Sequence, residues 1–171
     1  MHQLAMWPIS LLVVIAALWD FQARRIPNWL VGPFLFLGIA LSLYFHGWNG
    51  LGHSVLGVLM AGMILGILYW LRAMGMGDVK LFAAIGAWIW PEQLTTALTA
   101  TALAGGVLAM IWAIRGGFLK ESFAGAGDLL AGFVQRGVRP HKTLVLSNPR
   151  ARKMPYAPAI AIGTIFSFFA S

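Results

Sequence analysis

Two aspartates, Asp20 and Asp78, are the residues in this sequence best suited to chemistry. The chain has only five acidic residues, and each of these two stands at the edge of a long apolar run. A carboxylate at membrane depth costs about 2.5–3.5 kcal/mol at a helix centre and less near the interface, so its presence suggests a function. Two carboxylates in one site do not ionise together easily, so one keeps its proton while the other stays charged.

Such a pair supplies an acid and a base in one place. In aspartyl proteolysis the charged carboxylate deprotonates a water that attacks a peptide carbonyl, and the protonated one donates to the carbonyl oxygen. This chemistry requires no metal, cofactor or covalent enzyme intermediate. The alternative is that both aspartates only cap helix ends, with Asp78 near the N-terminus of a helix. Position alone leaves both interpretations open.

The residues around Asp78 favour the catalytic interpretation. In Gly75-Met76-Gly77-Asp78-Val79-Lys80, two glycines remove side chains beside the acid, so an extended substrate could approach closely. The segment Gly125-Ala126-Gly127-Asp128 has the same GxGD pattern. It precedes apolar residues at helical spacing, so we interpret Asp128 as the N-cap of a short amphipathic helix.

The elements that must position these acids are membrane helices. Of the 171 residues, 60% are hydrophobic and 10% charged, against about 25% charged in soluble domains. The sequence therefore predicts an all-α integral membrane protein with a single domain over residues 1–171. Six apolar runs are candidate spans: 4–19, 29–45, 51–71, 79–90, 94–114 and 155–170. The fourth is short enough to be a half-spanning or protein-buried helix instead.

The positive charges predict the orientation. All 12 Lys and Arg residues fall in the segments 20–28, 72–80 and 115–154, which lie inside if six spans cross and the N-terminus is outside. A five-crossing chain would move eight of these cations outside. The six-crossing arrangement brings Asp20, at the end of the first span, and Asp78, at the start of the fourth, to the same inner surface. Glu92, on the outer side, and Glu121, in the long basic segment, do not match Asp20.

Three separated stretches resemble the prepilin peptidases, a family of GxGD membrane aspartyl proteases. The first matches the family's catalytic Asp followed by an Arg, Ile-Pro-Asn segment, the second its GxGD-Val-Lys block, and the third its Pro-Tyr-x-Pro-Ala-Ile block. They are Asp20-Phe21-Gln22-Ala23-Arg24-Arg25-Ile26-Pro27-Asn28, Gly75 to Lys80 with Leu81 and Gly86, and Pro155-Tyr156-Ala157-Pro158-Ala159-Ile160-Ala161-Ile162-Gly163.

The resemblance implies an aspartic endopeptidase of the bacterial inner membrane that removes the leader of type IV pilin precursors at the cytoplasmic face. Its partners would be the pilin precursor and pilus assembly machinery. Family members that also act as N-methyltransferases carry an extra N-terminal cytosolic region, often with paired cysteines. This chain has no cysteine and resembles the short, peptidase-only members of tight-adherence (Flp) pilus systems.

The resemblance also assigns roles to individual residues. Asp20 and Asp78 are implied as the catalytic pair. Residues implied in substrate binding or structural support are Gly75, Gly77, Lys80, Arg25, Pro27, Asn28, Pro155, Tyr156 and Pro158. Lys80 either snorkels to the interface or favours the ionised form of a nearby acid. The segment 115–154 either lies on anionic lipid or is a solvated loop.

Other constellations give weaker signals. His2, His46, His53 and His141 show no paired ligand spacing, so we expect no metal site. The net charge of +7 follows the predicted inner segments, and we expect no nucleic-acid partner. Gly62 and Gly66, four residues apart, predict close approach of another helix. A rival function is a small transporter or proton-conducting protein that uses the same carboxylates.

Overall fold

The computed structural model describes residues 2–23, 26–71, 74–116 and 156–170, and every regular element in these ranges is a helix. This confirms the predicted all-helical fold. The helices are α1 (His2–Ala23), α2 (Asn28–Trp70), α3 (Met76–Gly86), α4 (Pro91–Arg115) and α6 (Ala157–Ala170). Asp128, Glu121 and nearly all of the basic segment 115–154 lie outside the described residues.

Three helical segments are long and apolar enough to cross a membrane: Met6–Ala23, Asn28–Trp70 and Pro91–Arg115. The apolar helix α6 is shorter. Large apolar side chains on these helices face outward, with Phe36 72%, Trp48 82% and Leu103 70% exposed. Water does not favour so much exposed apolar surface, whereas lipid does. These features confirm that the chain is a membrane protein.

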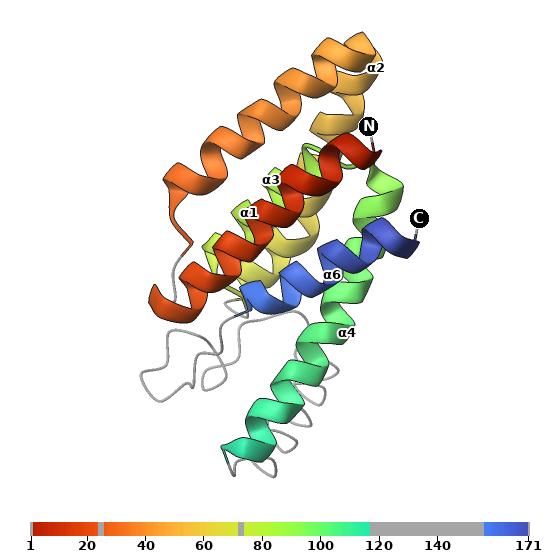
Figure 1. The fold of residues 1–171 in the computed structure, drawn as a ribbon. Coiled ribbons are helices and arrows are strands. Elements are labelled where there is room, and N and C mark those ends of the chain that lie inside the picture. The colour runs from red at the N-terminus through yellow and green to blue at the C-terminus, as the bar shows by residue number, and fades with distance from the viewer. Residues whose placement is uncertain (1, 24–25, 72–73, 117–155, 171) are drawn as a thin grey trace.

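Helix α2 reverses direction within its length. A straight helix of 43 residues would be about 65 Å long, roughly twice the apolar thickness of a bilayer. Gly47 interrupts it with φ +57° and ψ −145°, a conformation that glycine adopts at low cost. Two arms therefore lead away from this bend (Figure 1), and the predicted spans 29–45 and 51–71 fall one on each arm.

The fourth predicted span, 79–90, differs from the observed helix. Helix α3 runs from Met76 to Gly86 and has only 11 residues. It begins earlier because Gly75 is its N-cap, and the chain then turns before Pro91 starts α4. Four of its side chains are fully buried, namely Leu81, Phe82, Ala84 and Ile85. Helix α3 is thus a short, protein-buried helix, and Asp78 lies within its first turn.

Helix α3 and the turn that follows it pack closely against the two arms of α2. A Cβ atom added at Gly57 of α2 would collide with the carbonyl oxygen of Gly86 at the end of α3. Just beyond that end, the Ser54 hydroxyl donates to the Ala87 carbonyl at 2.7 Å, and the Trp88 indole donates to the Phe34 carbonyl at 2.8 Å. These contacts fix the depth of α3, and hence of Asp78.

The close approach predicted at Gly62 and Gly66 is not found among the described residues, since no described atom lies within 4 Å of a Cβ built at either position. Small residues mediate contact elsewhere, between α4 and α6. There Gly163 lies against Thr101, and Gly105 lies under the ring of Tyr156. In Figure 1, the α2 bend and the N-terminal end of α1 lie toward one end of the bundle, and the start of α6 lies toward the other.

Candidate active site

Asp20 lies in the last turns of α1 and is almost completely buried, with 7% of its surface exposed. Its Oδ2 atom accepts a hydrogen bond of 3.2 Å from the backbone N–H of Ala157, 137 residues further along the chain. Ala157 is the first residue of α6. The start of α6 therefore positions the Asp20 carboxylate, which connects the first sequence block to the third.

Asp78 is the third residue of α3, and the backbone of its N-cap Gly75 is extended. The Asp78 N–H donates to the Gly75 carbonyl at 3.2 Å, and the Gly75 backbone also hydrogen-bonds the Asp78 carboxyl group. An acid at this position that reaches back to the N-cap is one half of a capping box. Asp78 therefore has the capping role that position alone suggested, in addition to any catalytic one.

The Asp78 carboxyl group is suited to hold a proton near neutral pH. Its pKa is raised from 3.8 to about 7, chiefly by burial and next by the nearby Asp20 charge, while the Gly75 backbone hydrogen bond offsets part of the rise. Asp78 precedes the predicted span 79–90, in the first turn of α3. Because the Asp20 charge contributes to the raised pKa of Asp78, the two carboxyl groups lie close enough to interact electrostatically.

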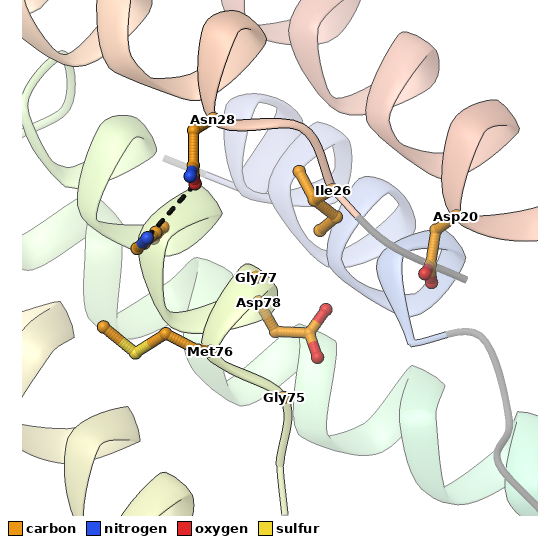
Figure 2. A pocket seen from close by; sticks show the side chains of 8 residues that line it. Asp20, Ile26, Asn28, Gly75, Met76, Gly77 and Asp78 are labelled. Atoms are coloured by element: carbon orange, nitrogen blue, oxygen red, sulfur yellow. Dashed lines mark hydrogen bonds between the residues drawn. The ribbon is translucent and has the colours of Figure 1, made fainter. Parts of the chain in front are cut away.

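Both carboxylates line one pocket of about 350 Å³. Figure 2 shows Asp20 and Asp78 on two separate helices that border the same space. The lining comes entirely from the first two sequence blocks: Asp20, Ile26, Asn28, Gly75, Met76, Gly77, Asp78 and Lys80. Six of these eight residues were predicted as site residues. The two acids are 58 residues apart in the sequence, and the fold brings them to the same pocket.

Gly77 lines the pocket, and one side of it is covered by Ile26. A Cβ atom added there would lie 3.3 Å from the Cβ atom of Ile26, so the space beside Gly77 is taken by the α1–α2 connection. Gly77 is also helical, and only Gly75 has extended backbone. A Cβ atom added at Gly75 would likewise lie 3.3 Å from the Asp78 Oδ2 atom. The glycine-flanked edge for a substrate strand therefore stays a prediction. Gly77 lets the connection cross close to Asp78.

Lys80 and Asn28 join α3 to the start of α2. The Lys80 ammonium donates to the Asn28 side-chain oxygen at 3.1 Å, which is drawn as the dashed line in Figure 2. Lys80 is partly buried. Its ammonium is therefore bound to a neighbouring amide at the edge of the pocket and does not only extend to an interface.

The other predicted site residues lie outside the pocket lining. Pro27 is the N-cap of α2, and its carbonyl accepts hydrogen bonds from the first turn. Tyr156 does the same for α6, and Pro158 lies in the first turn of that helix. Pro27 thus stabilises the start of α2, directly after Ile26. Tyr156 stabilises the start of α6, where the Ala157 N–H binds Asp20. Arg25 and Pro155 lie outside the described residues.

Three contributors were missed as site residues. Ile26 and Met76 line the pocket. Both lie within the first two sequence blocks, so their position in the sequence near Asn28 and Asp78 could have indicated them. Ala157 contributes a backbone N–H, which no side-chain pattern indicates. Within the described ranges, no group of three or more His, Asp or Glu residues is placed to hold a metal ion.

Residues 7–110 match the type IV leader peptidase family. A protein of Pectobacterium carotovorum subsp. carotovorum named prepilin leader peptidase/N-methyltransferase is 27% identical over 92% of this chain and 48% of its own length. Proteins of the same name from Aeromonas salmonicida and Klebsiella pneumoniae are each 33% identical, over 52% and 54% of this chain and 32% and 43% of their own lengths. The chain thus spans half or less of these curated relatives. No solved structure matches it.

Proposed function

This chain belongs to the type IV leader peptidase family, and we propose that it is an aspartic endopeptidase that removes the leader of type IV pilin precursors, in particular Flp-like ones. The observation that carries this proposal is the single pocket lined by Asp20 of α1 and Asp78 of α3. The names of the relatives, prepilin leader peptidase/N-methyltransferase, support the same reaction class.

In the proposed reaction, Asp78 is the proton donor and Asp20 the base. Asp78 suits the donor role because its pKa of about 7 leaves it substantially protonated at neutral pH. Asp20 takes a proton from water, the water oxygen bonds to the scissile carbonyl carbon, and Asp78 donates to the carbonyl oxygen. When the tetrahedral intermediate collapses, Asp20 gives its proton to the leaving amine and the C–N bond breaks. Asp78 takes back a proton from the hydroxyl group whose oxygen becomes the carbonyl oxygen of the new carboxyl group.

The proposed substrate is a short leader followed by a hydrophobic helix in the membrane. The apolar outer surfaces of the helices would keep that helix in the same lipid layer as the enzyme. We propose the bacterial inner membrane, one domain over residues 1–171, the N-terminus outside and cleavage at the cytoplasmic face. The proposed six crossings count the short α3, buried among the other helices, together with the turn that follows it as the fourth. Anionic lipid beneath 115–154 and the pilus assembly machinery are the proposed further partners.

The proposal does not extend to N-methyltransferase activity. The connection between α1 and α2 is short, because α1 ends at Ala23 and α2 begins at Asn28. Within its described part, Ile26 packs against Gly77 and lines the acid pocket. The cofactor-free chemistry of the acid pair accounts for peptide hydrolysis alone.

The test is leader removal from a tagged pilin precursor of the same genome, in cells without another such peptidase, followed by gel shift. Asp20→Asn and Asp78→Asn should each reduce cleavage by at least about 100-fold, since each removes one partner of general acid–base catalysis. Glu92→Gln, at an exposed acid on α4, and Asp128→Asn are matched controls that should cleave normally. Cleavage that survives both active-site changes would reject the acid pair and favour the transporter alternative.

A further inference from the structure

The pocket has a second polar end, formed by Lys80 and Asn28, that the acid–base mechanism does not use. The Asn28 oxygen already accepts a hydrogen bond from Lys80. What remains is two ammonium N–H groups of Lys80 and the amide NH₂ of Asn28, which have no hydrogen-bond partner among the described residues. This end therefore offers four N–H donors against one remaining lone pair on the Asn28 oxygen, and a carboxylate is the side-chain group that only accepts.

Lys80 is not there to neutralise Asp78. Residues two apart on a helix do not face each other, and within the described ranges no carboxylate oxygen lies within 4.0 Å of the Lys80 ammonium. The pKa of Asp78 is raised to about 7, whereas a close ammonium would lower it. The positive charge of Lys80 is thus available to a group that enters the pocket from outside.

The donor end and the acid pair belong to one cavity but are separated within it. Figure 2 shows Asn28 and Asp20 on opposite sides of Ile26, and all three line the same 350 Å³ space. A chain whose scissile bond lies at the two aspartates therefore places a different residue of its own at Lys80. A carboxylate there would also be kept away from the negative charge of the catalytic pair.

We propose that Lys80 and Asn28 bind an acidic side chain of the peptide being cut, at a position displaced from the scissile bond, and so determine which substrates are cleaved. This inference rests on the proposed peptidase function. It assigns substrate selection to two residues on different helices, α3 and α2, whose hydrogen bond fixes the spacing between donors.

The experiment uses the full-length protein in lipid vesicles and a series of pilin-like peptides, each with a leader and a hydrophobic helix. A single Glu is moved through the positions on both sides of the cut, and each peptide is compared with its Gln counterpart by kcat/KM. The wild type should prefer Glu at one position by about tenfold, the lower range for a hydrogen bond to a charged group. The Glu-to-Gln ratio within one enzyme cancels changes in overall activity.

Lys80→Gln should bring this ratio to about one, and Lys80→Glu should prefer Lys over Glu at the same position. Arg115→Gln, which removes an exposed cation at the far end of α4, is the matched control and should keep the wild-type ratio. Asn28→Asp keeps the size of the side chain and should also abolish the preference, because the new carboxylate pairs with Lys80. This variant serves if the Lys80 variants fold poorly.

A flat profile in the wild type, or a preference that Lys80→Gln leaves intact, overturns the inference while the peptidase proposal stands. A flat profile in which cleavage instead depends on anionic lipid, and loses that dependence in Lys80→Gln, overturns it in favour of a lipid headgroup. No cleavage of any peptide or precursor overturns the peptidase proposal and this inference together.

Discussion

At the scale of single residues, Asp78 has two roles that make different demands. Its carboxyl group closes the first turn of α3 through Gly75, which favours the charged form near a helix N-terminus. Burial and the charge of Asp20 favour the protonated form and prevail, because the pKa is raised to about 7. A residue that served only as a cap would show the opposite shift.

The pH dependence of cleavage follows from this pKa. If Asp78 must donate a proton, activity should fall as the pH rises through about 7, the value at which half of the Asp78 groups have lost their protons. The measurement is single-turnover cleavage between pH 5.5 and 9 with a substrate lacking titratable groups near the cut. Activity that increases through this range would contradict the assignment of Asp78 as the donor.

The same shift predicts how Asp78→Asn affects stability. A folded-state pKa raised from 3.8 to about 7 means that the folded protein binds more protons than the unfolded one between these values, so stability falls as the pH rises through them. Asp78→Asn removes this loss. The variant should melt higher than the wild type at pH 8, by at least about 2 °C, or about 1 kcal/mol, and the gain should vanish at pH 4.

This stability measurement also separates the two roles of Asp78. A residue that acted only as a cap would lose favourable charge at the helix N-terminus on substitution, so the variant would melt lower at pH 8. An inactive protein with increased stability at pH 8 is the result expected of a buried catalytic carboxyl group. Thermal melts in one detergent at both pH values make the comparison.

The location of the acid pair could be predicted from the sequence because charge asymmetry along the chain fixed which span ends share a surface. The support of Asp20 could not, because it comes from the backbone N–H of Ala157, a group that every residue except proline possesses. The position of Ile26 over Gly77 also escaped prediction. A glycine indicates that space is needed but not which group fills it.

At the scale of elements, apolar run length predicted the long helices well and the short one poorly. The runs at 4–19 and 94–114 lie within α1 and α4, because a continuous apolar helix has few other solutions in lipid. The run at 79–90 became an 11-residue helix followed by a turn. Its apolar residues are satisfied by burial in protein instead of lipid, and composition does not distinguish these environments.

Glycines on the second arm of α2 give an element-scale prediction. Gly57→Ala should destabilise the protein by about 1–3 kcal/mol, the usual cost of overpacking, because its Cβ would meet the Gly86 backbone of α3. Since α3 carries Asp78, cleavage should fall too. Gly62→Ala is the matched control on the same arm. It has open space around it and should be neutral or gain up to about 1 kcal/mol, as measured by thermal melts.

A destabilised Gly62→Ala variant would mean that a helix outside the described residues packs there, as the spacing with Gly66 originally suggested. An unchanged Gly57→Ala variant would show instead that α3 can shift away from α2. In that case the depth of Asp78 would depend on contacts other than the Gly57–Gly86 approach, such as the Ser54 and Trp88 hydrogen bonds.

At the scale of the whole molecule, the fold sets the two ends of the bundle apart. The α2 bend at Gly47 lies toward one end in Figure 1, and the pocket lies where α1 ends and α3 and α6 begin. A pocket at this end of the bundle suits the proposed peptidase, which would meet its substrate at one membrane surface. The same arrangement means that the orientation of the chain decides on which side of the membrane cleavage takes place.

That orientation is testable because the sequence has no cysteine, so each introduced cysteine reports alone. Asn49 near the α2 bend, Gln22 near the pocket end, and Leu103 in the middle of α4 are all exposed. In intact cells, a membrane-impermeant maleimide should label Asn49→Cys and not Gln22→Cys, because positive segments remain inside. Opening the cells should make Gln22→Cys reactive. Leu103→Cys, in lipid, should stay unreactive in both preparations. Labelling of Gln22→Cys from outside would put the acid pair on the outer surface, where a leader that remains in the cytoplasm could not reach it.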